Sequence, residues 1–213
     1  MKGGRKRFGT RWDELRREFI ADAPASLSQK IQEALPLATE FEGVCVRIVN
    51  TQRAKSGEAL STEGSRIHGG RYNSRDEFGV LYLSCDEPTC LAEINYYLNK
   101  YGIDPASLSP EAKTMVDVSV KLTKVLDLTD PDVRLAIGVT EPDLKVEWED
   151  VKRAGDEAIT QSIGRLAREA GFEAIIVPSA RHSGNNLVIL NPDNLSAPAQ
   201  LLVADQRTPQ LGG

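Results

Sequence analysis

Residues 114–122 alternate strictly between apolar and polar side chains, and this pattern restricts the fold more than any other segment. Successive side chains of a strand point to opposite sides, so the segment is predicted to be a strand with one buried face. The side chains expected on that face are Val116, Val118, Val120 and Leu122. Shorter apolar runs predict further strand segments at residues 44–49, 80–84, 125–128, 174–177, 187–190 and 200–203.

Helical spacing of apolar residues appears between these strands, at residues 11–20, 28–37 and 151–170. A fourth helix is expected to begin at Asp86, which suits an N-cap and is followed by Pro88 in the first turn. The strands are short and do not alternate regularly with the helices. This arrangement indicates an α+β fold, with a mixed β-sheet core of short strands and flanking helices.

The overall composition fits one main domain, because 40% of the 213 residues are apolar. We expect residues 1–40 to form a basic N-terminal helical extension, residues 41–204 the main domain and residues 205–213 a flexible tail. The basic start is typical of a solvated arm. The formal net charge of -5 argues against direct nucleic-acid binding, which depends on a basic surface.

The cysteines and the apolar segments indicate a cellular location. Cys45, Cys85 and Cys90 form no CxxC pair and are odd in number, which suits free thiols in a reducing compartment. The sequence has no apolar run near the roughly 20 residues of a membrane span, and its N-terminus lacks the apolar region of a signal peptide. We therefore expect a cytoplasmic protein without membrane association.

Several common catalytic motifs are missing from the sequence. It contains no GxGxxG segment after a strand, no GxxxxGK[ST] loop and no GxSxG turn. With two histidines, His68 and His182, and scattered cysteines, it also lacks the spacing of metal ligands. A Rossmann dehydrogenase, a P-loop NTPase and a metal site are therefore not expected.

Three polar side chains that are far apart in the sequence each lie beside a predicted strand. Arg47 lies within an apolar strand, where a guanidinium is costly to bury unless it is paired, so a salt bridge and a ligand site both remain open. Glu93 lies on the helix that follows Asp86, where an acidic residue is most often solvated. Ser183 lies in the polar loop 178–186. We interpret these three residues as parts of one site.

The ordered set of motifs resembles the RES domain proteins, over about residues 43–191. The set comprises the arginine of the early strand, Gly-Gly-Arg-Tyr-Asn at 69–73, Leu-Tyr-Leu-Ser at 81–84, the helix carrying Glu93, and Ser-Gly-Asn-Asn at 183–186. The family is named for its arginine, glutamate and serine, which here would be Arg47, Glu93 and Ser183. The resemblance implies a fold similar to ADP-ribosyltransferase toxins, and an NAD+-consuming toxin of a bacterial toxin–antitoxin pair.

The resemblance also implies roles for individual residues around NAD+ as substrate, without a metal. Glu93 would stabilise the positive charge that develops on the ribose when the nicotinamide bond breaks. Arg47 and Arg71 would hold phosphate oxygens, Tyr82 would contact the nicotinamide end, and Ser183 would position the ribose or the amide. The residues expected to be catalytic are Arg47, Tyr82, Glu93 and Ser183. The residues expected to bind NAD+ are Arg47, Arg71, Asn73, Tyr82 and Ser183.

The resemblance further implies a cognate antitoxin with a helix-turn-helix DNA-binding domain. We also expect a homodimer, formed through a sheet edge or through Trp12, Leu15 and Phe19 of the N-terminal extension. The acceptor of the ADP-ribosyl group stays open between water, phosphate and a protein. Other readings are a mono-ADP-ribosyltransferase, a non-catalytic nucleotide-binding module and, from the basic start alone, an RNA-cleaving toxin.

Overall fold

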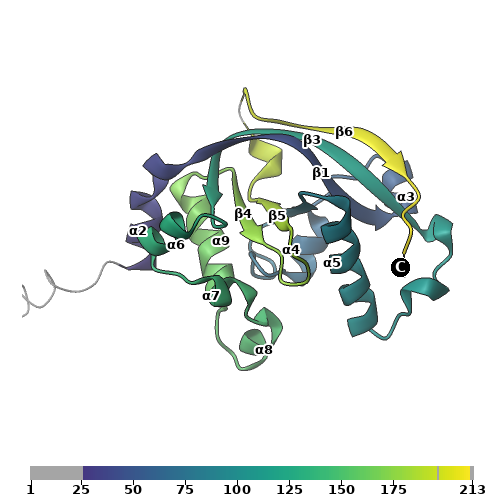
Figure 1. Cartoon of the computed structure of the whole chain (residues 1–213), viewed down its shortest axis with the longest axis horizontal. Helices are drawn as coiled ribbons and strands as arrows, with labels where there is room; N and C mark the ends of the chain where they lie inside the picture. Colours follow the sequence, from purple (N-terminus) through teal and green to yellow (C-terminus); the bar gives the residue numbers. More distant parts are fainter. Residues whose placement is uncertain (1–25, 196, 212–213) are drawn as a thin grey trace, which may run out of the picture.

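The structure is a computed structural model that describes residues 26–195 and 197–211 (Figure 1). Within these residues, six strands form one sheet in the order β1-β2-β5-β4-β3-β6. The strands are β1 (Thr39–Asn50), β2 (Leu81–Ser84), β3 (Lys113–Asp127), β4 (Ala174–Pro178), β5 (Asn185–Ile189) and β6 (Gln200–Arg207). Every strand segment expected from the sequence lies in or overlaps one of these six, and 114–122 and 125–128 belong mostly to the one long strand β3.

Strand β3 organises the sheet because it pairs with three other strands. One edge pairs antiparallel with β1, and the other pairs antiparallel with β6 and then parallel with β4. Strand β1 also pairs with β2 at Val46 and Ser84, so the series β1-β2-β5-β4-β3 returns to β1. Figure 1 shows β1, β3 and β6 arching over β4 and β5. The sheet is therefore strongly curved and folds back on itself.

The helices of the described residues lie beside and below this arch. The α-helices are α2 (Leu27–Glu33), α3 (Thr51–Lys55), α4 (Glu63–His68), α5 (Glu87–Lys100), α6 (Pro131–Ile137), α7 (Glu141–Lys145), α8 (Trp148–Arg153) and α9 (Ile159–Ala170). Short 3₁₀ helices are η1 (Leu35–Leu37), η2 (Pro105–Ser107), η3 (Pro110–Ala112) and η4 (Pro192–Asn194). Helices α2, α6 and α9 gather on one side, and α5 lies on the other (Figure 1). The mixed sheet with flanking helices confirms the expected α+β class.

Helix α5 begins where the sequence predicts. The Asp86 carboxylate accepts a hydrogen bond of 2.7 Å from the backbone N–H of Thr89, and Pro88 occupies the first turn. This cap satisfies an N–H group that has no partner inside the helix. Because Asp86 follows strand β2 after a single residue, the cap also fixes where α5 leaves the sheet.

The single helix predicted over residues 151–170 is wrong. Helix α8 ends at Arg153 and α9 begins at Ile159. Gly155 between them has a φ of +92°, which a right-handed helix cannot contain. The apolar stripe is real within α9, where Ile163 and Ala167 are fully buried. The spacing thus predicted α9 correctly but joined it to a separate helix. The helix expected over residues 11–20 lies outside the described residues.

The core divides into two main clusters, one on each face of the sheet. Val116, Val118, Val120 and Leu122 are buried as predicted and pack in one cluster with Leu81 and Leu83 of β2. Tyr82 points to the opposite face and packs against the other cluster, which contains residues of α2, α6 and α9. The strand alternation therefore places Tyr82 where the sequence predicted, on the face away from its two leucine neighbours.

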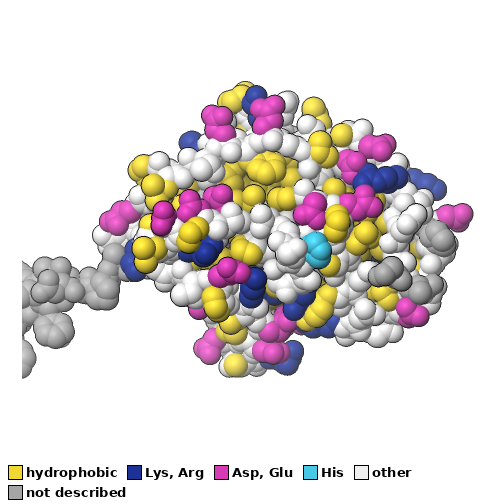
Figure 2. Space-filling model, in the orientation of Figure 1, with side chains coloured by type: hydrophobic (Ala, Val, Ile, Leu, Met, Phe, Trp, Pro, Cys, Tyr) yellow, Lys and Arg dark blue, Asp and Glu magenta, His cyan; other side chains and the backbone are white. Residues whose placement is uncertain are grey.

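The surface carries no extended region of one charge on the face shown in Figure 2, where acidic and basic side chains are interspersed. In residues 26–195 and 197–211, no helix is long and apolar enough to cross a membrane.

Candidate active site

A cavity of about 520 Å³ opens between β1, β2, α5 and the loops around residues 61–72, 147–149 and 177–181. Cavities of roughly 300–1,000 Å³ are typical of sites for small molecules. Four of the residues expected from the sequence line it, namely Arg47, Arg71, Tyr82 and Glu93. The fold thus brings together an arginine of β1, an arginine of a loop, a tyrosine of β2 and a glutamate of α5.

Glu93 is held in a fixed orientation by two neutral side chains. Its Oε1 accepts a hydrogen bond of 2.6 Å from the hydroxyl of Ser179 and one of 2.8 Å from the amide of Asn186. Among the described residues, Oε2 has no hydrogen-bond partner. One carboxylate oxygen is therefore fixed by the protein and the other is left for a ligand in the cavity.

The two partners of Glu93 are themselves oriented by the sheet and the following loop. The Asn186 Oδ1 accepts a hydrogen bond of 2.9 Å from Ser84, its cross-strand neighbour. The Ser179 hydroxyl oxygen accepts the backbone N–H groups of Arg181 and His182 at 3.0 and 3.2 Å. Because this oxygen already accepts two hydrogen bonds, its own proton is directed to Glu93.

Ser183, the serine expected in the site, lies elsewhere in the loop. Its side chain is exposed and does not line the cavity, whereas Ser179 is only 1% exposed and contacts Glu93 directly. Sequence reasoning missed Ser179, although one signal was present. Ser179 directly follows the buried strand β4, and a side chain at a strand end is positioned by the sheet more firmly than one within a loop.

Arg47 is a largely buried cation in the cavity wall. Burial, together with the nearby charge of Arg53, lowers the pKa of its guanidinium to about 10. The ion pairs of the described residues do not include Arg47, and its one hydrogen bond is a long one of 3.5 Å to the carbonyl of Ser61. The salt bridge left open by the sequence is therefore not found in this part of the chain. A buried guanidinium without a counter-charge favours an anionic ligand.

Arg71 lines the cavity and also holds part of the cavity wall in place. Its guanidinium donates to the backbone carbonyls of Leu144, at 3.2 Å, and Val146. These bonds tie the loop after the two glycines to the segment between α7 and α8. Its contacts therefore place Arg71 at the cavity, with part of its hydrogen-bonding capacity already used.

Tyr82 lines the cavity, and a hydrogen-bond network that includes the buried Asn73 holds it in place. The Tyr82 hydroxyl accepts the backbone N–H of Tyr72 and donates to Oδ1 of Asn73, both at 2.9 Å. Asn73 is fully buried, does not line the cavity, and donates to the carbonyls of Ser65 and Phe78. Burial also raises the pKa of Tyr82. The ring of Tyr82 can contact a ligand, while its hydroxyl and Asn73 hold the loop.

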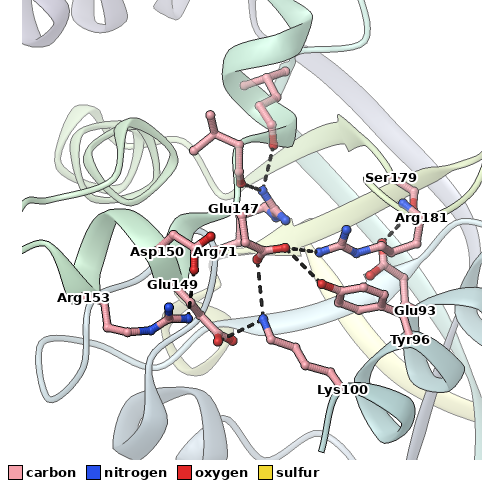
Figure 3. Close-up of polar contacts among 12 residues, drawn as sticks. Arg71, Glu93, Tyr96, Lys100, Glu147, Glu149, Asp150, Arg153, Ser179 and Arg181 are labelled. Atoms are coloured by element: carbon pink, nitrogen blue, oxygen red, sulfur yellow. Dashed lines mark hydrogen bonds and ion pairs between the residues drawn. The ribbon is translucent and has the colours of Figure 1, made fainter.

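A second polar cluster lies at the rim of the cavity, centred on Glu147 (Figure 3). Its carboxylate accepts hydrogen bonds from Arg181 at 2.7 Å and from the Tyr96 hydroxyl at 3.0 Å, and lies 3.6 Å from Lys100. The Arg181 guanidinium stacks on the Tyr96 ring at 3.4 Å. Burial tends to raise the pKa of Glu147, but these donors outweigh it and the pKa is lowered.

The cluster connects the start of α8, the later part of α5 and the loop after β4. Sequence reasoning missed it because Tyr96, Glu147 and Arg181 share no motif and meet only through the fold. In the part of the chain that the structure describes, His, Cys, Asp and Glu side chains form no group of three that could hold a metal ion.

Comparison with known proteins supports the resemblance found in the sequence. The sequence model of the RES domain matches residues 44–210. The protein named NAD(+) phosphorylase MbcT, in Mycobacterium tuberculosis and Mycobacterium bovis, is 27% identical over 162 residues, covering 76% of this chain and 80% of the relative. A probable NAD(+) phosphorylase of M. tuberculosis, Rv3189, is 35% identical over 115 residues, covering 54% of this chain and 50% of the relative.

A solved structure shows the same fold. The crystal structure of the M. tuberculosis MbcT–MbcA toxin–antitoxin complex matches this chain with a TM-score of 0.63 and 25% identity, covering 85% of this chain and 93% of that one. The expected α+β architecture and the family resemblance are both confirmed by these matches.

Proposed function

Because the chain belongs to the RES domain family, we propose that it is an NAD+-cleaving enzyme of the NAD+ phosphorylase type and the toxin of a toxin–antitoxin pair. The observation that carries this proposal is the pairing of two groups in one cavity. The carboxylate of Glu93 is oriented by Ser179 and Asn186, and the buried guanidinium of Arg47 has no carboxylate partner among the described residues. NAD+ carries a group that complements each of them. Its cationic nicotinamide ring, bonded to ribose, suits the carboxylate, and its pyrophosphate suits the guanidinium.

The reaction needs stabilisation of positive charge at the ribose. When the bond between the ribose carbon and the nicotinamide nitrogen breaks, its electron pair leaves with nicotinamide, which becomes neutral. The ribose carbon then carries developing positive charge, which the carboxylate of Glu93 stabilises. An oxygen of inorganic phosphate forms the new bond to the same carbon, so the products are nicotinamide and ADP-ribose 1″-phosphate.

The remaining residues bind and orient the substrate. Arg47 holds the pyrophosphate, since a charge-assisted bond to an anion compensates the burial of its guanidinium. The ring of Tyr82 contacts the nicotinamide, and Arg71 supports the phosphate side from the loop it anchors. We assign to Ser179, in place of Ser183, the role of the serine in this site, because Ser179 is buried and donates a hydrogen bond to the cavity-lining Glu93.

Product analysis tests the proposed reaction. The purified protein is incubated with NAD+ in buffers with and without inorganic phosphate, and the products are identified by mass spectrometry. Phosphate-dependent ADP-ribose 1″-phosphate, released together with nicotinamide, is expected. Free ADP-ribose at an equal rate in both buffers would instead identify a hydrolase, and label from NAD+ found only on protein would identify an ADP-ribosyltransferase.

A toxin of this type needs a cognate antitoxin, and we propose one with a helix-turn-helix domain, acting with the toxin in the cytoplasm. Expression of this chain alone is expected to arrest growth, and co-expression with its antitoxin is expected to restore growth and to yield a stable complex. We further propose a homodimer, supported by exposed apolar residues on the edge strand β6, where Leu202 is 55% and Val203 is 41% exposed. A monomeric mass in light scattering would contradict the dimer.

A further inference from the structure

Two cysteines lie directly opposite each other where β1 meets β2. The strands are antiparallel, and Val46 pairs with Ser84, so the next position of this register pairs Cys45 with Cys85. Directly opposed residues of antiparallel strands have Cα atoms roughly 4.5–5.5 Å apart. This separation falls within the range of about 4.4–6.8 Å that a disulfide spans. Both cysteines are free thiols in the structure.

The two thiols also share one environment. Both side chains pack in the same apolar cluster, together with Val118 of β3. The interaction between the two thiols raises the pKa of Cys45 and lowers the pKa of Cys85. Cys45 is fully buried, whereas Cys85 is partly exposed. Cys85 is therefore the sulfur that an external reagent can reach, and Cys45 is placed to resolve the product.

We propose that Cys45 and Cys85 form a redox-responsive dithiol, which closes to a disulfide on reaction with an oxidised low-molecular-weight thiol. The Cys85 thiolate attacks the reagent's disulfide, whose S–S bond breaks and releases one thiolate. The Cys45 thiol loses its proton and attacks the mixed disulfide, which releases the second thiolate. The protein loses two protons and two electrons, and the reagent gains both as two free thiols.

This bond would join the two elements that carry the site. Cys45 precedes Arg47 by two residues on β1, and Cys85 immediately precedes Asp86, the N-cap of the helix that bears Glu93. Forming the bond draws the two free sulfur atoms together to about 2.05 Å. The start of α5 shifts toward β1 as a result, and Glu93 moves relative to Arg47. The oxidised enzyme therefore turns over more slowly, a consequence that rests on the proposed function.

Cys90 provides an internal control in the same helix. It is 6% exposed, and burial raises the pKa of its thiol to about 12. It packs with Val46 and Met115 in a third apolar cluster, apart from the cluster that holds Cys45 and Cys85. We expect Cys90 to stay reduced while Cys45 and Cys85 react.

The experiment treats the full-length protein with oxidised glutathione and maps its cysteines by mass spectrometry. The expected product is lighter by about 2 Da, contains linked peptides of Cys45 and Cys85, and leaves Cys90 free for alkylation after denaturation. Its thermal midpoint rises, because the bond closes a long loop. NAD+ turnover falls several-fold and recovers with dithiothreitol. Cys90→Ser is expected to form the same link as the wild type, and Cys85→Ser to form no intramolecular link.

Three results would overturn the proposal. They are the absence of a link between Cys45 and Cys85, a link that involves Cys90, and a complete link with unchanged turnover. If no form of the protein cleaves NAD+, the peptide map and the thermal shift still decide whether the disulfide forms, so failure of the proposed function is distinguished. If Cys85→Ser does not fold, differential alkylation of the wild-type protein gives the same map.

Discussion

The carboxylate of Glu93 and the hydroxyl of Ser179 are joined by a hydrogen bond of 2.6 Å, across 86 positions of the sequence. This contact links helix α5 to the end of strand β4. It fixes one oxygen of the carboxylate and leaves the other facing the substrate cavity. The geometry of the proposed reaction therefore depends on Ser179 even though this serine performs no chemistry itself.

Removal of this hydroxyl is expected to slow the reaction. Ser179→Ala should lower kcat for NAD+ cleavage by about 10- to 100-fold, since hydrogen bonds to charged groups contribute about 1.5–3 kcal/mol. Ser183→Ala is the matched control, because it makes the same change at an exposed position of the same loop, and it should keep wild-type kinetics. Equal losses in the two variants would show that the loop, and not the contact with Glu93, matters.

Arg47 is expected to favour substrate binding and to lower the stability of the folded protein. Arg47→Met keeps much of the side-chain volume but removes a buried charge that has no counter-charge among the described residues. The variant should raise KM for NAD+ by about 10- to 100-fold. It should be at least as stable as the wild type, because replacing a poorly compensated buried charge by an apolar group removes its desolvation cost. Kinetics and urea unfolding measure the two effects.

The control for this variant is Arg153→Met. The Arg153 side chain is 72% exposed and pairs with Asp150, so its loss should change neither KM nor stability noticeably. A large loss of stability in Arg47→Met would indicate that Arg47 is mainly a structural group.

Gly164 of α9 is expected to tolerate no side chain, although alanine is normally the better helix former by about 1 kcal/mol. A Cβ atom at this position would lie 1.9 Å from the carbonyl oxygen of Tyr72. Helix α9 would have to move away from the cavity loop, so Gly164→Ala should lower the free energy of unfolding by about 2 kcal/mol or more. Gly64→Ala in α4, where nothing lies within 4 Å, should be neutral or stabilising. Thermal or urea unfolding of the pair checks this.

The Glu147 cluster predicts a specific pH dependence of stability. The pKa of Glu147 is lower in the folded protein than in the unfolded chain. Its contribution is therefore fully present above the unfolded value of about 4.3 and is lost as the pH falls through the lowered folded value. The stability difference between the wild type and Glu147→Gln should be constant near neutral pH and shrink in acid. Urea unfolding of both proteins across this range gives the difference, and one that grew in acid would contradict the assignment.

The strands were predictable because each buried face imposes an alternation that a sequence preserves, as Val116 to Leu122 shows. The start of α5 was predictable because the cap at Asp86 is a local signal. The break between α8 and α9 was missed because the apolar spacing continues across Gly155, whose left-handed conformation the spacing does not reveal.

The residues of the site also divide into those that the sequence predicted and those that only the fold reveals. Arg47, Tyr82 and Glu93 were found from strand faces and the family motifs, and all three line the cavity. Ser179 was missed because the choice between two serines of one loop depends on how that loop folds back. Here the backbone N–H of Ser179 bonds the carbonyl of Gly184, which places Ser179 inside and Ser183 outside.

The most direct test of the central claim is the rate of NAD+ cleavage by Glu93→Gln beside the wild type, with phosphate present and nicotinamide release as the signal. Glutamine keeps the shape of the side chain and an oxygen for Ser179 and Asn186, but it removes the charge. We predict that kcat falls by about 10²–10³-fold, while NAD+ still binds. Wild-type kcat in this variant would contradict the assignment of Glu93 as the group that stabilises the developing positive charge.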